Sequence, residues 1–225
     1  KTVSILNTNG GTLDLNGRDS NVNGGGTGVA TVLSGATGGI GLLTGLGGLI
    51  TNNAAGTGTN WLVINQSTGS RGSYGGTISD GATAKVGVSV MANYNQAAFQ
   101  VLAGNNTYTG GTYLQHLYTG ANGRAETLSI GNVASIGSFG SRNLTFKGAS
   151  TNPDVILQLT GTAVNNSNQF DAMTFTSGLG AGIDVADPTN TFTLGKDAAG
   201  ADIAMTGSGS FEKLGAGTLV ITSGS

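Results

Sequence analysis

The chain has 225 residues, of which 42 are glycine, and only 9% are charged, with a formal net charge of −2. Glycine costs about 1 kcal/mol per helical position relative to alanine, so this composition disfavours helices, while 37% hydrophobic residues are enough to form a core. The nine basic residues are scattered singly, which argues against a nucleic-acid partner, and the absence of cysteine excludes disulfides and thiolate metal sites.

Short apolar runs rich in β-branched residues recur along the whole chain, between clusters of glycine, asparagine and serine. Runs of about four or five residues with at least one apolar face are typical of strands. The chain is therefore predicted to be all-β. The predicted strands lie at 12–15, 29–33, 61–64, 86–90, 99–102, 127–130, 144–146, 155–159, 173–175, 192–194 and 218–222.

Two arrangements of these strands are open. Antiparallel hairpins favour two-residue Asn-Gly or Asp-Gly loops, and five such dipeptides begin at positions 9, 16, 23, 80 and 122. A parallel β-helix accounts for more of the pattern, because asparagine and glycine suit its corners and aliphatic side chains stack in rows inside it. At roughly 20 to 25 residues per coil, the chain would form about nine to eleven coils in a single domain spanning 1–225.

Two segments carry the most specific motifs, NNTYTGGT at 105–112 and KLGAGTLVITSG at 213–224. They resemble the two halves of the autotransporter-associated β-strand repeat, in which K-x-G-x-G-T-L-x-L-x-G leads into N-T-Y-T-G-G-T. The resemblance implies a right-handed parallel β-helix from the passenger region of a type V secreted bacterial surface protein. Such a passenger is exported through a membrane barrel, which we expect outside this chain, and is extracellular or attached to the cell surface.

Within NNTYTGGT, a β-helix would place Asn106, Gly110 and Gly111 at corners, with 107–109 as a strand between them. The second motif ends at Gly224, where the repeat would continue into another N-T-Y-T-G-G. We therefore expect a piece of a longer passenger or a subunit of a fibre. The expected partner is the same chain, which either continues into further coils or self-associates through its terminal coils, because open strand edges invite pairing.

The sequence offers little for catalysis. His116 is the only histidine, and no Gly-x-Ser-x-Gly elbow occurs in a strand-to-helix context, so we predict a surface or loop histidine rather than a catalytic one. The glycines form no phosphate-binding loop. We predict no enzyme activity, no catalytic, cofactor-binding or metal-binding residues, and no cofactor.

Carboxylates need a separate test, because some parallel β-helices cleave polysaccharides with clustered acidic residues. Asp184 and Asp187 would point to opposite faces of a continuous strand, and Pro188 ends any strand there, so a turn with solvated carboxylates is predicted. A glycan or calcium site is the alternative, since 180–185 is similar to one copy of a calcium-binding nonapeptide repeat. The other acidic candidates are Asp154, Asp197 and Asp202.

Aromatic side chains could stack against sugars, but tyrosine on a β surface more often packs between strands, and Trp61 is predicted to lie in the core. A structural, non-catalytic solenoid is the predicted function. An adhesin that binds a host or glycan ligand through loops 18–28, 66–73 or 161–170 remains an alternative. The tyrosines concerned are Tyr74, Tyr94, Tyr108, Tyr113 and Tyr118.

Overall fold

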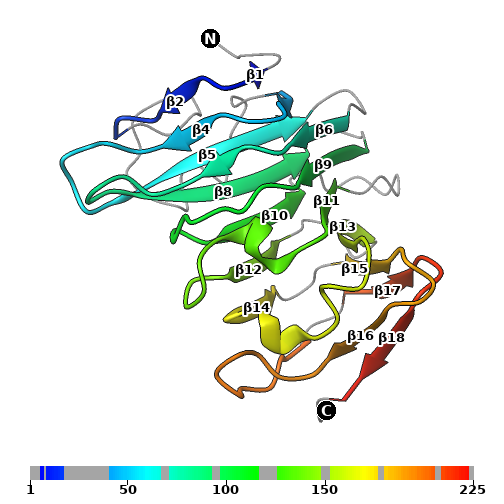
Figure 1. The fold of residues 1–225 in the computed structure, drawn as a ribbon. Coiled ribbons are helices and arrows are strands. Elements are labelled where there is room, and N and C mark those ends of the chain that lie inside the picture. Colours follow the sequence, from blue (N-terminus) through cyan, green and yellow to red (C-terminus); the bar gives the residue numbers. More distant parts are fainter. Residues whose placement is uncertain are drawn as a thin grey trace.

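The computed structural model describes nine parts of the chain, and almost all their regular structure is β-strand (Figure 1). Within these parts, the helical segments are two short 3₁₀ turns, η1 (Val133–Ile136) and η2 (Ser167–Gln169). The predicted all-β class is confirmed. The described residues are 6–7, 9–17, 41–66, 71–92, 97–116, 126–147, 153–176, 180–205 and 209–222.

The strands form parallel sheets. Within each sheet the strands follow one another along one axis, which runs from β2 (Thr12–Asp14) at the top of Figure 1 to β18 (Thr218–Ile221) at the bottom. A five-stranded sheet has the order β14-β12-β10-β8-β5, and a six-stranded sheet has the order β17-β15-β13-β11-β9-β6. The five-stranded sheet comprises β5 (Thr59–Gln66), β8 (Lys85–Ala92), β10 (Thr112–His116), β12 (Asn143–Lys147) and β14 (Ala172–Phe175). The six-stranded sheet comprises β6 (Arg71–Tyr74), β9 (Ala98–Leu102), β11 (Glu126–Ile130), β13 (Pro153–Leu159), β15 (Gly180–Val185) and β17 (Phe211–Leu214).

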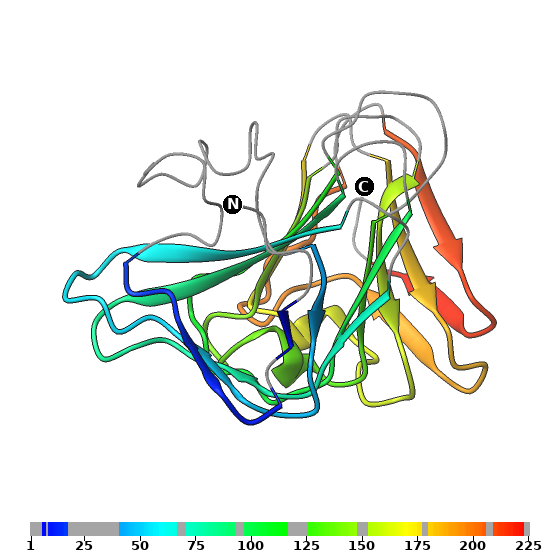
Figure 2. The same ribbon diagram turned by 90° about the horizontal axis from the view of Figure 1, so that it is seen from above.

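Shorter strands form the remaining wall, and Figure 2 shows from above how the coils lie over one another. The chain passes from this wall to the five-stranded sheet and then to the six-stranded sheet, as in β4, β5 and β6, before it repeats the circuit. A parallel β-solenoid is therefore confirmed. The strands of this wall are β2 (Thr12–Asp14), β4 (Leu49–Thr51), β7 (Thr77–Ile78), β16 (Thr191–Leu194) and β18 (Thr218–Ile221). The paired strands β1 (Leu6–Asn7) and β3 (Leu43–Thr44) continue the wall of the six-stranded sheet, because Gly45 forms a parallel bridge to Tyr74 of β6.

The solenoid has about five turns, so the predicted nine to eleven coils are wrong. Residues in register on adjacent coils are 24 to 37 positions apart, as in Val88 and Thr112 and in Leu13 and Ile50. Most coils thus take more residues than the roughly 20 to 25 assumed from sequence.

Inward side chains stack in rows, because the register between parallel strands places equivalent residues above one another. In both main sheets every second residue of a strand faces the interior, as expected from the period of two. Burying such rows removes apolar surface from water, which drives the folding of the solenoid. One row of fully buried residues in the five-stranded sheet is Ile64, Val90, Leu114 and Phe146. One in the six-stranded sheet is Tyr74, Leu102, Ile130, Leu159 and Val185.

Asn106 lies at a corner, as predicted, and ties three coils together. Its side-chain Oδ1 accepts a hydrogen bond from the Ile78 backbone N–H at 2.8 Å, and its Nδ2 donates to the Ser135 carbonyl at 2.6 Å. Both partners belong to neighbouring coils. A buried amide is stable there because its hydrogen-bonding groups are satisfied by otherwise unpaired backbone.

The predicted strand at 107–109 is wrong, although the segment does stack. Thr107 donates its backbone N–H to the Ile78 carbonyl of the preceding coil, but no regular ladder follows. Tyr108 instead turns fully inside. Burial still alternates, with Asn105 and Thr107 exposed and Asn106 and Tyr108 buried, so the segment places side chains inside at a corner without forming a strand.

Gly110 and Gly111 are corner residues, as predicted. Gly111 has a φ of +86°, which favours glycine, and it directly precedes β10. A Cβ on Gly110 would lie 2.5 Å from the Val86 carbonyl oxygen of the preceding coil. These glycines therefore allow the chain to turn close against the previous coil.

Four strands of the main sheets were missed in sequence, β6, β10, β15 and β17, and the predicted run 29–33 lies outside the described residues. The glycine-rich β15 contains Asp184, for which the sequence predicts a turn. Inside the sheet its Gly182 is covered by neighbours, because a Cβ there would lie 3.3 Å from Ile156 Cγ1 and 3.6 Å from Leu214 Cδ1. Side chains from adjacent coils thus replace the missing one, which a single sequence does not reveal.

Candidate functional site

The last described coil ends in two strands with an open edge. β17 pairs with β15 and β18 pairs with β16, each on one side only among the described strands. These are the strands nearest the C-terminal end in Figure 1. Open parallel edges present backbone N–H and C=O groups that a further strand can pair with.

The apolar interior is exposed at this edge. Leu219 and Ile221 are in register with Phe192 and Leu194, which are fully buried, yet Ile221 is 50% exposed and Leu219 is only partly buried. Phe211 lies edge-to-face on Phe175, with ring centroids 5.9 Å apart, and is likewise only partly buried. Among the described residues, this coil therefore leaves apolar side chains of the inward rows exposed.

Lys213 interrupts this apolar end. Its register partner on β15 is Ile183, whose side chain is fully buried and faces the interior. The Lys213 side chain is exposed, and its ammonium donates to the Gly215 carbonyl at 2.6 Å. Within the described parts of the chain, no carboxylate pairs with it. An aliphatic row thus ends on a positive charge.

The two glycines of the K-x-G-x-G motif bring the last turn close to the previous coil. Gly215 has a φ of +77°, and a Cβ on it would collide with the Val185 carbonyl. A Cβ on Gly217 would collide with the Asp187 carbonyl. The motif therefore forms a tight corner that places β17 and β18 in register with the preceding coil.

The predicted turn at 184–187 is wrong for Asp184 and confirmed for Asp187. Asp184 lies on β15 and is partly buried, and its Oδ2 accepts a hydrogen bond from Gln158 Nε2 at 2.7 Å. Asp187 lies in a turn, where the hydroxyl of Thr189 donates to it at 2.7 Å and the Thr189 N–H at 2.8 Å. These bonds, the side-chain one first, lower the pKa of Asp187.

The ladder through Asp184 crosses three strands on the outer face of the six-stranded sheet. Ser129 Oγ donates to Gln158 Oε1 at 2.8 Å, and Gln158 in turn bonds Asp184. The three residues are in register on β11, β13 and β15. The Asp184 carboxylate therefore forms a hydrogen bond between two coils.

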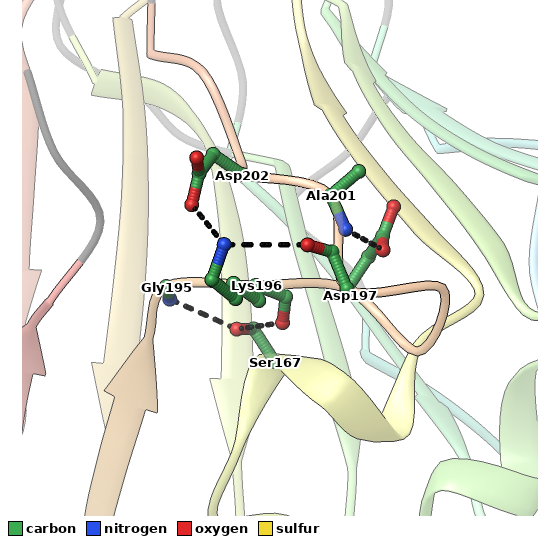
Figure 3. A network of polar contacts seen from close by, with 7 residues as sticks. Ser167, Gly195, Lys196, Asp197, Ala201 and Asp202 are labelled. Carbon is green, nitrogen blue, oxygen red and sulfur yellow. Dashed lines mark hydrogen bonds and ion pairs between the residues drawn. The ribbon is translucent and has the colours of Figure 1, made fainter.

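Asp197 and Asp202 stabilise the turn that follows β16 (Figure 3). Asp202 Oδ1 lies 2.8 Å from Lys196 Nζ, in an exposed ion pair, and Asp197 Oδ1 accepts from the Ala201 N–H at 2.9 Å. Ser167 Oγ donates to the Lys196 carbonyl at 2.8 Å, which joins the turn to η2. Asp154 lies on β13. In the part of the chain that is described, no three acidic or histidine side chains form a group that could hold a metal ion.

His116 is buried rather than on the surface or in a loop, so that prediction is wrong. It is 3% exposed and closes β10, in register with Ala92 of β8. The sequence did not predict the strand that contains His116. Its placement on the alternating inward positions of β10, with Thr112 and Leu114, explains the burial.

Glu126 is an unexpected buried residue at the start of β11. It shares the inward face with Leu128 and Ile130, is fully buried, and has no hydrogen-bond partner for either carboxyl oxygen among the described residues. Burial raises its pKa well above the ordinary value. Its alternation with Leu128 and Ile130 is a pattern in the sequence that could predict this inward placement.

The aromatic side chains do not form an exposed platform where they are described. Tyr74 and Tyr108 are fully buried, whereas Tyr94 and Tyr118 lie outside the described residues. Packing between strands is therefore the role of the described tyrosines. Loop 18–28 also lies outside the described residues, 71–73 of loop 66–73 belongs to β6, and 161–170 contains η2.

Trp61 is buried in a hydrophobic core cluster, so the prediction that it packs in the core is confirmed. It belongs to a separate cluster with Val63, Met91 and Tyr113, on the residues that alternate with the inward row of the five-stranded sheet. Trp61 meets Tyr113 edge-to-face, with centroids 4.8 Å apart. Its ring crosses Gly87, where a Cβ would lie 2.7 Å from Trp61 Cε3.

Comparison with family models, with curated proteins and with solved structures found no match to this chain. Among the residues that are described, no helix has the length and apolarity needed to cross a membrane. The open edge of β17 and β18 is therefore the candidate site, on the strength of its own geometry.

Proposed function

We propose that this chain is a structural, non-catalytic segment of a bacterial surface or secreted protein, in which β17 and β18 receive a further coil. The observation that carries the proposal is the open edge, where Phe211, Leu219 and Ile221 leave apolar rows unfinished. A further coil would bury these side chains and satisfy the backbone groups of both strands.

The mechanism of such a segment is mechanical. Parallel backbone pairing along the axis and stacked inward rows produce a rigid rod, which extends when coils are added and needs no reaction. A right-handed coil is part of the proposal, because parallel crossovers are right-handed in nearly all proteins. The resemblance of the motifs at 105–112 and 213–224 to autotransporter repeats supports an extracellular or cell-surface location.

End-to-end assembly is tested by sedimentation velocity over a concentration series, with electron microscopy of the same samples. Wild-type protein is expected to form short rods whose length grows with concentration. Ile221→Lys places a charge on the exposed apolar end of the inward row and should prevent growth. Phe139→Lys removes an exposed apolar side chain from a turn away from the edge and is the matched control. Wild-type protein that stays monomeric at its solubility limit would contradict assembly.

An adhesin is the second candidate, and one described loop favours it. At 161–170, exposed residues precede η2, and Asn166 and Gln169 form a capping box that holds the loop in one shape. A pre-organised loop loses less entropy on binding a ligand. Binding on a glycan array that disappears with a change in this loop would support the adhesin, and an array without signal would count against it.

A further inference from the structure

The open edge has a charge that restricts which strand can cover it. Lys213 occupies the position at which Leu128, Leu157 and Ile183 stack in the preceding coils. Those three side chains are fully buried because a coil lies on either side of them. A coil added to β17 would cover Lys213 in the same way.

Covering Lys213 with an apolar strand would bury an unpaired ammonium group, which is costly. Its hydrogen bond to the Gly215 carbonyl satisfies one donor and leaves its charge unpaired. A carboxylate in the covering strand would neutralise the charge and accept the remaining donors. The edge is therefore complementary to an acidic residue at one particular position.

The same strand disfavours pairing with a second copy of itself. If two solenoids met end to end through β17, the two copies of β17 would pair antiparallel. The inward residues of one copy would have to face the inward residues of the other. Two such registers pair three residues of each copy, and one places Glu212 opposite Glu212 while the other places Lys213 opposite Lys213. Like charges directly opposite one another destabilise a pair of strands. The edge thus selects a different strand, added in parallel as in every other sheet pairing of the described strands.

We propose that the edge of β17 binds a parallel β-strand that carries an aspartate or glutamate at the inward position opposite Lys213. The inference rests on the proposed function, because it assumes that a further coil is added here. It goes beyond that function by naming the chemistry of the coil that fits. Charge complementarity of this kind sets specificity and register.

A covalently added coil tests the inference. A copy of residues 195–225 is appended after Ser225, so that the copied strand 211–214 lies over β17. The guest position is the copied residue 213, which is Glu, Leu or Lys.

The Ser210 carbonyl accepts from the Ala181 N–H, so in this parallel ladder the amides of Glu212 and Leu214 face β15 and the amide of residue 213 faces the open edge. Protection of the residue 213 amide of β17 from hydrogen exchange therefore measures how firmly the copied strand is docked.

In the wild-type host, we expect protection in the order Glu, Leu, Lys, with at least about a tenfold gain in the docking equilibrium for Glu over Leu. In a Lys213→Ile host, Leu should dock more firmly than Glu, because the guest carboxylate would then be buried alone. Protection of the β5 and β8 amides confirms that the remaining solenoid is folded in every variant. This reversal between hosts separates a charge pair from a general effect of the guest residue.

The possible failures are distinguishable. Docking with equal protection for Glu and Leu in the wild-type host would overturn the acidic-partner inference and leave the proposed function intact. An unprotected residue 213 amide with all three guests, in a solenoid that is otherwise folded, would show that this edge does not receive a coil. That result would overturn the proposed function and the inference together.

Discussion

The hydroxyl groups of Tyr108 and Thr112 lie 2.6 Å apart in the interior of the solenoid, where both side chains are buried. Thr112 interrupts an aliphatic row, since its register partners are Val88 and Leu144. Burial raises the pKa of Tyr108, so the phenol stays protonated. The pair therefore satisfies two polar groups that would otherwise be stranded among apolar side chains.

Thr112→Val should destabilise the fold by about 1 to 3 kcal/mol, because it leaves the Tyr108 hydroxyl buried without its partner. Tyr108→Phe combined with Thr112→Val removes both hydroxyls and should recover most of that loss. Urea unfolding of the two single variants and the double variant measures the coupling. Additive losses in the double variant would show that the two hydroxyls are energetically independent.

Asn106→Ala should cost roughly 2 to 4 kcal/mol, since it leaves the Ile78 N–H and the Ser135 carbonyl without their cross-coil partner. Asn105→Ala is the matched control, because the neighbouring Asn105 is exposed, and its effect should stay within about 0.5 kcal/mol. Thermal and urea unfolding measure both. Equal losses for the two variants would remove the corner role from Asn106.

Glu126 should make stability fall as pH rises. The folded chain holds the Glu126 proton more tightly than the unfolded chain, because burial raises the pKa above the ordinary 4.5. Stability is then lost as pH rises from about 4.5 towards the raised pKa. Glu126→Gln should flatten this dependence, whereas Glu212→Gln on the exposed edge should keep it. Urea midpoints from about pH 4 to about pH 8 measure the effect. An unchanged slope in Glu126→Gln would show that another group causes it.

Gly87→Ala should destabilise the five-stranded sheet by about 1 to 3 kcal/mol, because the new Cβ would meet the Trp61 ring at 2.7 Å. Trp61 is the only tryptophan, so its fluorescence should shift as the ring moves off Gly87. Gly58→Ala, with open space around the added Cβ, is the control and should leave both the emission and the stability nearly unchanged. A wild-type emission spectrum from Gly87→Ala would contradict this packing.

Strands with aliphatic alternation could be predicted from sequence, while those without it could not. β8, β9, β11 and β13 contain the predicted runs, because each carries enough branched side chains to mark its own inward face. β15 and β17 were missed because glycine and charged residues occupy them. What makes them strands is the register with a neighbouring coil, which a propensity does not contain.

The same distinction applies to the candidate site. Glycine at the corners and the tight turn at 215–217 follow from motif and conformational preference. Lys213 lies next to Ile183 because of the register between β17 and the preceding coil. Ile221 is exposed because no described strand covers it on the other side. Sequence alternation places Lys213 with Phe211, but it does not say that this face is inward.

Composition and pattern alone determined that this protein is all-β, without a thiolate site, and built of short strands between asparagine- and glycine-rich turns, and they favoured a parallel β-helix over hairpins. These properties are local, since they follow from side-chain shape and backbone preference. Tertiary structure decided the number of coils, the burial of His116 and Glu126, and the placement of Trp61 in a second core cluster. Each of these depends on the register between residues roughly one coil apart, and that register is set by packing across the solenoid.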